Sequence, residues 1–238
     1  MCMMLKLEHI SSGYGKKQVL FDVSLEVQKG DVVLLAGSNG SGKSTLLKAI
    51  YGLLPLWETD TPEGKRKGSI IFDGEDITGK PTSALLKKGL LYIAQKNNLF
   101  EDLTVKENLE MAGLALNDQQ LLLQRMDKAL ETFSTLRPLL HRRPMKMSGG
   151  ERQLLTLAMA SLHEPKLILI DEPLIGLSGK NLGFVMENLK LLNERSGTTL
   201  VIVEHRVREM MGWMTRVVGM QLGEAINFSE LNFFTNSL

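Results

Sequence analysis

The chain contains the stretch Gly37-Ser38-Asn39-Gly40-Ser41-Gly42-Lys43-Ser44, which matches the P-loop pattern of spaced glycines followed by Lys and Ser. Glycines at these positions let backbone N–H groups turn inward around phosphate oxygens. Lys43 is expected to bring its charge to the β- and γ-phosphates of a nucleotide. The hydroxyl of Ser44 is expected to bind Mg²⁺, and Thr45 belongs to the same phosphate site.

The structural alternative for this stretch is a Gly/Ser-rich turn. The stretch lies between an apolar run and a helical pattern, as a P-loop does, and this position favours the P-loop. The start of the helix near Lys43 would add a positive dipole end to the site. By itself the motif predicts binding of a nucleoside triphosphate and nothing more specific.

Four short apolar runs, each followed by polar residues, predict buried strands. They are residues 32–36 before the P-loop, 90–94 before Gln95, 167–170 before Asp171 and Glu172, and 200–203 before Glu204 and His205. Near-continuous apolar character is typical of parallel strands that are covered on both faces. Helical patterns between the runs predict an α/β fold, in which ligands bind beyond the carboxyl ends of the strands. We therefore expect the polar clusters to share one edge of a mostly parallel sheet.

Other parts of the chain have different patterns. Residues 5–10 and 23–27 alternate apolar and polar side chains, which is typical of half-exposed antiparallel strands, and residues 69–74 predict a further strand and turn. These stretches indicate an antiparallel β flap beside the parallel core. Residues from about 99 to 147 are rich in helical patterns and are expected to form a small helical lobe.

Composition narrows the class of protein. A chain of 238 residues with a net charge of +1 is an ordinary globular protein of one or two domains, and it lacks the basic excess of a dedicated nucleic-acid binder. Its single cysteine, Cys2, cannot form an internal disulfide, which suits a reducing cytosolic compartment. No apolar run approaches the roughly 18–20 residues that span a bilayer. We expect any membrane association to depend on partner subunits.

Two acidic residues, Asp171 and Glu172, directly follow the third apolar run. An Asp at this place can hold Mg²⁺ through water, and the next carboxylate can polarise an attacking water. A solvated strand end is the structural alternative, since Asp-Glu pairs are common on surfaces. The P-loop in the same chain favours the catalytic interpretation.

The segment Ser148-Gly149-Gly150-Glu151 allows two compatible interpretations. Ser followed three residues later by Glu is a capping box at the start of an amphipathic helix. A capped helix N-terminus with glycines is also a good site for an anion. The capping box accounts for Ser148 and Glu151 but gives no reason for the two glycines.

Taken in order, these segments resemble the ATP-binding-cassette ATPases, the nucleotide-binding subunits of ABC transporters. The matching segments are Gly13-Tyr14-Gly15, the P-loop, Gln95, Ser148-Gly149-Gly150, residues 167–172 and His205. The resemblance implies a P-loop NTPase core with a mostly parallel sheet, an antiparallel β flap and a small helical subdomain. It implies one ABC ATPase domain over residues 1–238, with the core and flap at about 1–98 and 148–238 and the helical subdomain at about 99–147.

The resemblance also implies roles for single residues. Tyr14 would stack on adenine, Gln95 would contact Mg²⁺ or the attacking water, and His205 would touch the γ-phosphate as a switch. Glu172 would be the catalytic carboxylate and Asp171 a Mg²⁺ ligand. Two subunits would pack head to tail, so that the Ser148-Gly149-Gly150 signature of one faces the ATP of the other. Without the resemblance, Tyr14, Gln95 and His205 would be a turn tyrosine, a strand-end glutamine and a half-exposed histidine.

Some residues depart from the most frequent family pattern. Met147 and Glu151 replace Leu and Gln at the ends of the signature, and neither change argues for an inactive site. Ser178 stands where many members have an Asp after the catalytic Glu, and branched-chain amino-acid importer ATPases also tend to lack that Asp. The segments 51–55, 73–79 and 103–109 resemble the same subfamily. Residues 57–67 look like an inserted loop, for which we expect a solvated turn, with contact to a membrane subunit or anionic lipid as the alternative.

The resemblance implies an ATP- and Mg²⁺-dependent ATPase that powers a membrane ABC transporter, with an importer of branched-chain amino acids as the leading hypothesis. Its expected partners are transmembrane permease subunits and either a second copy or a paralogous ATPase subunit, with no nucleic acid. Its expected location is the cytoplasmic side of the cell membrane, as a peripheral subunit. The alternatives are the motor of an export or lipopolysaccharide-extraction system, a non-transport ABC ATPase, and a nucleotide-binding regulator without useful ATPase activity.

Overall fold

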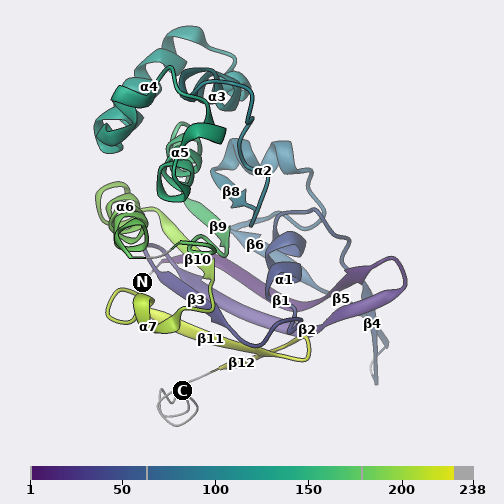
Figure 1. The fold of residues 1–238 in the computed structure, drawn as a ribbon. Helices are drawn as coiled ribbons and strands as arrows, with labels where there is room; N and C mark the ends of the chain where they lie inside the picture. The colour runs from purple at the N-terminus through teal and green to yellow at the C-terminus, as the bar shows by residue number, and fades with distance from the viewer. Residues whose placement is uncertain (1, 63, 178, 228–238) are drawn as a thin grey trace. The chain divides into compact units, whose positions relative to one another are not determined.

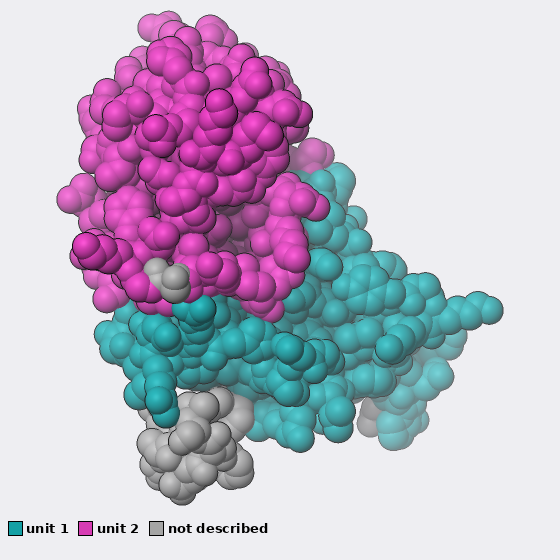
Figure 2. All heavy atoms as spheres, in the orientation of Figure 1, with its two compact units in different colours: residues 1–82, 201–238 teal, residues 83–200 magenta. Residues whose placement is uncertain are grey.

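The structure is a computed structural model that describes residues 2–62, 64–177 and 179–227. Its contacts divide the chain into two compact units, residues 1–82 with 201–238 and residues 83–200, coloured separately in Figure 2. We call them unit 1 and unit 2. Ser178, which departs from the usual family pattern, lies outside the described residues. Within the described ranges, no helix is long and apolar enough to cross a membrane.

The antiparallel flap of unit 1 is confirmed. Strands β1 (Met3–Tyr14) and β2 (Lys17–Gln28) pair antiparallel and form the long purple ribbons in Figure 1. Strand β6 (Ser69–Phe72) pairs with the other edge of β1, and the short β7 (Glu75–Asp76) completes the order β2-β1-β6-β7. Alternate side chains such as Leu5 and Leu7 are buried, which is why these strands alternate in sequence.

Unit 1 also contains the strand that leads into the P-loop. All five residues of β3 (Val32–Ala36) are buried, and β3 pairs in parallel with β11 (Arg216–Gln221). Strand β12 (Glu224–Asn227) adds an antiparallel edge that the sequence patterns did not predict. Helix α1 (Lys43–Ile50) follows the P-loop, and the short α7 (Val207–Met210) precedes β11.

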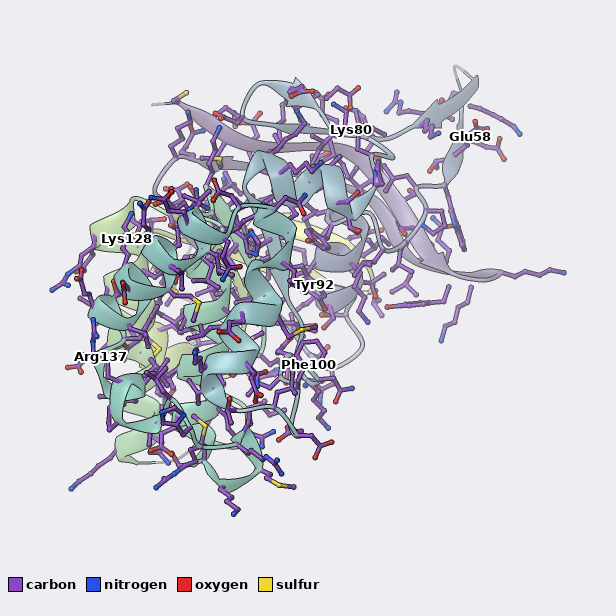
Figure 3. The ribbon with its side chains drawn as sticks, turned by 90° about the horizontal axis from the view of Figure 1, so that it is seen from above. Glu58, Lys80, Tyr92, Phe100, Lys128 and Arg137 are labelled. Carbon is purple, nitrogen blue, oxygen red and sulfur yellow. The ribbon has the colours of Figure 1, made fainter. Side chains whose placement is uncertain are left out.

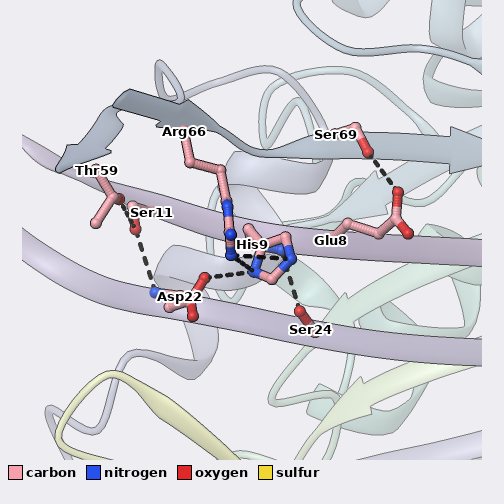
Figure 4. Close-up of polar contacts among 8 residues, drawn as sticks. All are labelled: Glu8, His9, Ser11, Asp22, Ser24, Thr59, Arg66 and Ser69. Carbon is pink, nitrogen blue, oxygen red and sulfur yellow. Dashed lines mark hydrogen bonds and ion pairs between the residues drawn. The ribbon is translucent and has the colours of Figure 1, made fainter. Parts of the chain in front are cut away.

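The loop prediction for residues 57–67 was wrong, because this segment forms a β-hairpin of β4 (Glu58–Thr61) and β5 (Gly64–Lys67). Opposite charges face each other across its strands, with Glu58 beside Lys67 and Asp60 beside Lys65. The other face is polar too and contacts β1. Thr59 Oγ1 donates to Ser11 Oγ at 2.8 Å, and the Arg66 guanidinium lies 3.4 Å from both ring nitrogens of His9 (Figure 4). A hairpin without an apolar face shows no hydrophobic alternation, so its sequence resembles a loop.

Unit 2 contains β8, β9 and the start of β10. Strand β8 (Leu90–Ile93) pairs in parallel with β9 (Leu167–Asp171), and β10 (Thr199–Val203) follows in the order β10-β9-β8. The boundary between the two units falls within β10. Helices α2 (Thr82–Lys88) and α6 (Lys180–Ser196) precede β8 and β10 along the chain. The parallel pairing of β8 with β9 and of β3 with β11 confirms the α/β fold.

The stretch between β8 and β9 is helical, as the patterns predict. It contains α3 (Val105–Gly113), α4 (Gln119–Thr132) and α5 (Gly149–Ser161), with short 3₁₀ helices at Leu114–Leu116, Ser134–Leu139 and Pro144–Lys146. Side chains such as Leu109, Phe133 and Leu155 are fully buried and form its core. Thr104 and Glu107 form a capping box that starts α3.

Candidate functional site

In unit 1, the P-loop is a tightly turned segment between β3 and α1. Gly42 precedes the helix with a left-handed φ of 103°, a conformation that side chains rarely adopt. A Cβ added at Gly37 would lie 2.2 Å from the carbonyl oxygen of Met220, so only glycine allows the loop to lie against β11. The buried strand thus ends in a loop whose backbone can face a ligand.

Polar side chains of the P-loop fit a phosphate. Lys43 is only 5% exposed, and its Nζ donates to the carbonyl oxygens of Gly37 and Ser38 at 2.8 and 2.9 Å. The buried Ser41 Oγ has no hydrogen-bond partner among the described residues. An unpaired buried hydroxyl costs about 1–3 kcal/mol, so an oxygen-rich ligand would relieve that cost. The donor set is therefore suited to phosphate oxygens.

Tyr14, predicted to stack on adenine, lies at the end of β1 and is 45% exposed. Lys48 of α1 approaches it, with Nζ 3.5 Å from the phenol oxygen and 5.7 Å from the ring centroid. A cation near an aromatic face is favourable and restrains the ring. Lys48 was not singled out from the sequence, where it is one of many helical lysines.

In unit 2, the parallel register of β8 and β9 brings Gln95 to Glu172. Ile93 pairs with Ile170, and Gln95 and Glu172 each lie two residues beyond this pair along the chain. Gln95 Nε2 donates to Glu172 Oε2 at 2.5 Å. Two residues that are 77 positions apart in the sequence therefore meet, as the common-edge prediction requires.

Asp171 is the last residue of β9 and is 4% exposed. The hydroxyl of Tyr92, a residue of β8 that is labelled in Figure 3, donates to Asp171 Oδ2 at 3.3 Å. Sequence reasoning missed Tyr92, because within an apolar strand it looks like a packing residue. The contact gives the carboxylate a neighbour that restricts its orientation.

The backbone of Glu172 is unusual. Its φ is +50°, in the left-handed region that a residue with a Cβ adopts only at a cost of about 1–3 kcal/mol. Its carbonyl oxygen accepts a hydrogen bond from Ile175 N at 3.3 Å, within the turn that leaves β9. Strain of this kind occurs where the surrounding structure imposes a particular direction on a side chain. Here that side chain is the predicted catalytic carboxylate.

The signature segment contains the capping box that its sequence predicts. Ser148 Oγ accepts from Glu151 N at 3.3 Å, and Glu151 Oε2 accepts from Ser148 N at 2.7 Å. Ser148 is exposed at the start of α5. The structure also gives a reason for the glycines. A Cβ would lie 3.0 Å from Leu177 at Gly149 and 3.2 Å from Asn181 at Gly150, so both allow close packing within unit 2.

A hollow of about 320 Å³ lies beside the signature in unit 2. Its lining residues come from the segment after β8, from α5 and from the turn after β9, and they include Gln95, Gly149, Arg152 and Pro173. Arg152 forms a two-pronged ion pair with Glu101 and also donates to Pro144 O at 3.2 Å. Gln95 and the signature thus line the same cavity.

His205 follows β10 in unit 1 and is exposed, and the buried Glu204 precedes it. The predicted site residues therefore fall into two groups. Unit 1 holds Tyr14, the P-loop with Ser44 and Thr45, and His205. Unit 2 holds Gln95, Asp171, Glu172 and the segment Ser148 to Gly150.

Comparison with known proteins gives a consistent result. Residues 20–175 match the family model described as ABC transporter. The chain is 36% identical to the high-affinity branched-chain amino acid transport ATP-binding protein BraG of Pseudomonas aeruginosa over 94% of this chain and 91% of that protein. It is 34% identical to the probable branched-chain amino acid transport ATP-binding protein LivF of Archaeoglobus fulgidus, over 87% and 84% of the two chains.

Solved structures give the same result. An ATP-binding cassette of an ABC transporter in its ADP conformation is 28% identical and covers 95% of this chain and 90% of its own, with a TM-score of 0.81. A dimeric cassette in a post-hydrolysis state, bound to ADP and Pi, is 26% identical over 95% of this chain and 100% of its own, with a TM-score of 0.75. The chain therefore belongs to the ABC transporter family and is one of its ATP-hydrolysing, ATP-binding subunits.

Proposed function

We propose that this ATPase powers the import of branched-chain amino acids through membrane permease subunits. The observation that supports this substrate class is the similarity, over most of the chain, to two ATP-binding proteins of branched-chain amino acid transport. No comparable observation favours lipopolysaccharide extraction or a non-transport role. The transported molecule itself would be selected by the partner subunits.

In this proposal each predicted site residue has a specific task on ATP. Lys43 and the P-loop amides hold the phosphates, and Tyr14 stacks on the adenine. Ser44, Gln95 and Asp171 are the proposed Mg²⁺ ligands, and the ion would neutralise charge on the β- and γ-phosphates. Their hydroxyl, amide and carboxylate oxygens are the donors that Mg²⁺ prefers.

Glu172 is the proposed general base for the water that attacks the γ-phosphate. Its hydrogen bond from Gln95 at 2.5 Å fixes the direction of the carboxylate, and its strained backbone is consistent with an imposed position. His205 would contact the γ-phosphate and report its presence. The exposed Ser148 at the N-terminus of α5 is suited to bind a phosphate oxygen of a second subunit's ATP.

The working form in this proposal is a head-to-tail dimer, either of two copies or of this chain with a paralogue. The dimeric cassette bound to ADP and Pi, which is similar over 95% of this chain, supports a dimer. Permease subunits would hold the dimer at the cytoplasmic face of the cell membrane. ATP binding would close the dimer and hydrolysis at Glu172 would open it.

The test is purification of the tagged chain from membranes, followed by transport with the co-purified subunits in proteoliposomes. We expect ATP-dependent uptake of leucine, isoleucine or valine. The Glu172→Gln variant should bind ATP, accumulate as a dimer and lose uptake. Only soluble partners, or ATPase activity stimulated by lipopolysaccharide but not by amino acids, would contradict the proposal. Undiminished ATP turnover in Glu172→Gln would refute only the role of Glu172 and would leave the proposed transport function standing.

A further inference from the structure

Glu204 is a buried carboxylate at the point where β10 ends. Every residue of β10 is buried, and Glu204 itself is only 3% exposed, whereas the next residue, His205, is exposed. Burial of a carboxylate is unfavourable unless hydrogen bonds or opposite charges stabilise it there. None of the roles above uses this charge.

The bonds of Glu204 fix the turn that follows the strand. Its Oε1 accepts from the backbone N–H of His205 at 2.9 Å and from that of Arg206 at 3.2 Å. Arg206 precedes α7 with φ −87° and ψ 65°, and no side chain caps this helix. One carboxylate oxygen thus accepts hydrogen bonds from two successive N–H groups that are in neither helix nor strand. Hydrogen bonds to a charged group are stronger than those between neutral groups, so this pair favours one conformation of the turn.

We propose that Glu204 is a positioning residue for His205. His205 projects from this turn, so the turn sets the direction of its Cα–Cβ bond. The carboxylate of Glu204 holds that turn from inside unit 1, and the imidazole then meets the γ-phosphate in one orientation. The inference rests on the proposed function, in which His205 contacts that phosphate. A displacement of 1 Å in such a group can lower a rate by about 10²-fold.

Three variants test the inference by kinetics. Glu204→Ala removes the acceptor, Glu204→Gln retains an oxygen in the same place, and Glu209→Ala removes an exposed carboxylate from α7 as a matched control. We expect Glu204→Ala to lower kcat about tenfold or more with less than about a twofold change in ATP affinity. Glu204→Gln should recover at least half of kcat, and Glu209→Ala should match the unmodified protein. Full activity of Glu204→Ala, or equal loss in Ala and Gln variants, would overturn the inference.

A measurement independent of activity covers the case in which Glu204→Ala folds poorly or the role of His205 fails. The chain has four histidines, so its imidazole NMR signals can be assigned by single substitution, with His205→Ala identifying the relevant one. Glu204→Ala and Glu204→Gln should be compared by these spectra. We expect the His205 signal to move in the Ala variant and the signals of His9, His141 and His163 to stay. An unmoved His205 signal would refute the positioning role, whereas full ATPase activity of His205→Ala would refute only the proposed role of the histidine.

Discussion

Gln95 donates a hydrogen bond from Nε2 to Oε2 of Glu172 at 2.5 Å, although the two residues follow different strands. The parallel register of β8 and β9 brings them together, and both extend two residues beyond paired positions. A glutamine amide donates to this carboxylate without neutralising it, so the carboxylate remains able to accept a proton from water. The pair therefore couples the segment after β8 to the proposed catalytic carboxylate.

Replacing Gln95 should lower the rate of hydrolysis more than ATP binding. Gln95→Ala removes the hydrogen bond from Nε2 to the Glu172 carboxylate. Loss of a hydrogen bond to a charged group costs about 1.5–3 kcal/mol, so we expect kcat to fall about tenfold with ATP affinity changed less than twofold. Steady-state ATPase kinetics and nucleotide binding measure the two effects. Gln153→Ala removes another amide from the same hollow and serves as the control. Equal losses of kcat in both variants would mean that any change in the hollow slows hydrolysis, and would contradict a specific role of the Gln95–Glu172 hydrogen bond.

Substitutions at Ser148 separate its two roles. Ser148→Ala removes the cap of α5 and should destabilise the protein by about 1 kcal/mol, whereas Ser148→Asn retains a good N-cap and should be nearly as stable as the unmodified chain. If the hydroxyl also serves ATP in a second subunit, both variants should lose ATP hydrolysis. Urea unfolding and ATPase assays give the two readouts. A stable, fully active Ser148→Asn variant would leave Ser148 with the capping role alone.

Sequence patterns predicted the features of this protein that depend on residues close together in the sequence. Continuous apolar runs predicted β3, β8, β9 and β10, and the common edge of parallel strands predicted that Gln95 would lie near the carboxylates. The contact of Tyr92 with Asp171 and the close packing at Gly149 and Gly150 depend on residues distant in sequence, which no local pattern specifies. The β4–β5 hairpin was missed because polar contacts, rather than an apolar face, hold it to β1.

Loss of the Tyr92 hydroxyl should affect the requirement for Mg²⁺. Tyr92→Phe keeps the ring but removes the donor to Asp171 Oδ2, so the proposed Mg²⁺ ligand is less well oriented. We expect the Mg²⁺ concentration for half-maximal ATPase activity to rise about tenfold or less, because the bond is long at 3.3 Å. A Mg²⁺ titration of both nucleotide binding and ATPase activity measures this. Tyr51→Phe is the control, and an unchanged Mg²⁺ requirement in Tyr92→Phe would contradict the orienting role.

Acid should destabilise the protein partly through His163. Burial lowers the pKa of His163, and the positive charge of Arg125 acts in the same direction, while the bond from Nε2 to the carbonyl oxygen of Ala112 opposes the shift. The folded pKa is thus below the ordinary value of 6.5. The neutral imidazole contributes its full share of the free energy of unfolding above about pH 6.5. This share is lost as the pH falls through the lower folded pKa.

Urea unfolding at pH 7.5, 6.5 and 5.5 tests this effect. The unmodified protein should lose more stability between pH 7.5 and 5.5 than His163→Gln does. His141→Gln changes an exposed histidine of the same unit and serves as the matched control. Identical pH profiles for the unmodified protein and His163→Gln would exclude His163 as the source.

The two faces of the β4–β5 hairpin should respond differently to substitution. Arg66 lies against the His9 ring, and His9 Nδ1 lies 2.7 Å from Asp22 Oδ1. On the other face, Lys65 and Glu58 form an exposed ion pair at 3.9 Å, which is worth at most about 1 kcal/mol. Arg66→Gln should therefore loosen the hairpin from β1, and Glu58→Gln should not.

Limited digestion with proteinase K, mapped by mass spectrometry, measures hairpin opening. We expect cleavage between residues 58 and 67 to be several-fold faster in Arg66→Gln than in Glu58→Gln, with ATPase activity of the intact chains equal. Because two-stranded hairpins are marginal in water, attachment to β1 is what should protect the segment from cleavage. Equal cleavage rates would show that the Arg66–His9 contact does not hold the hairpin, and reduced ATPase activity in Arg66→Gln alone would instead connect the hairpin to nucleotide turnover.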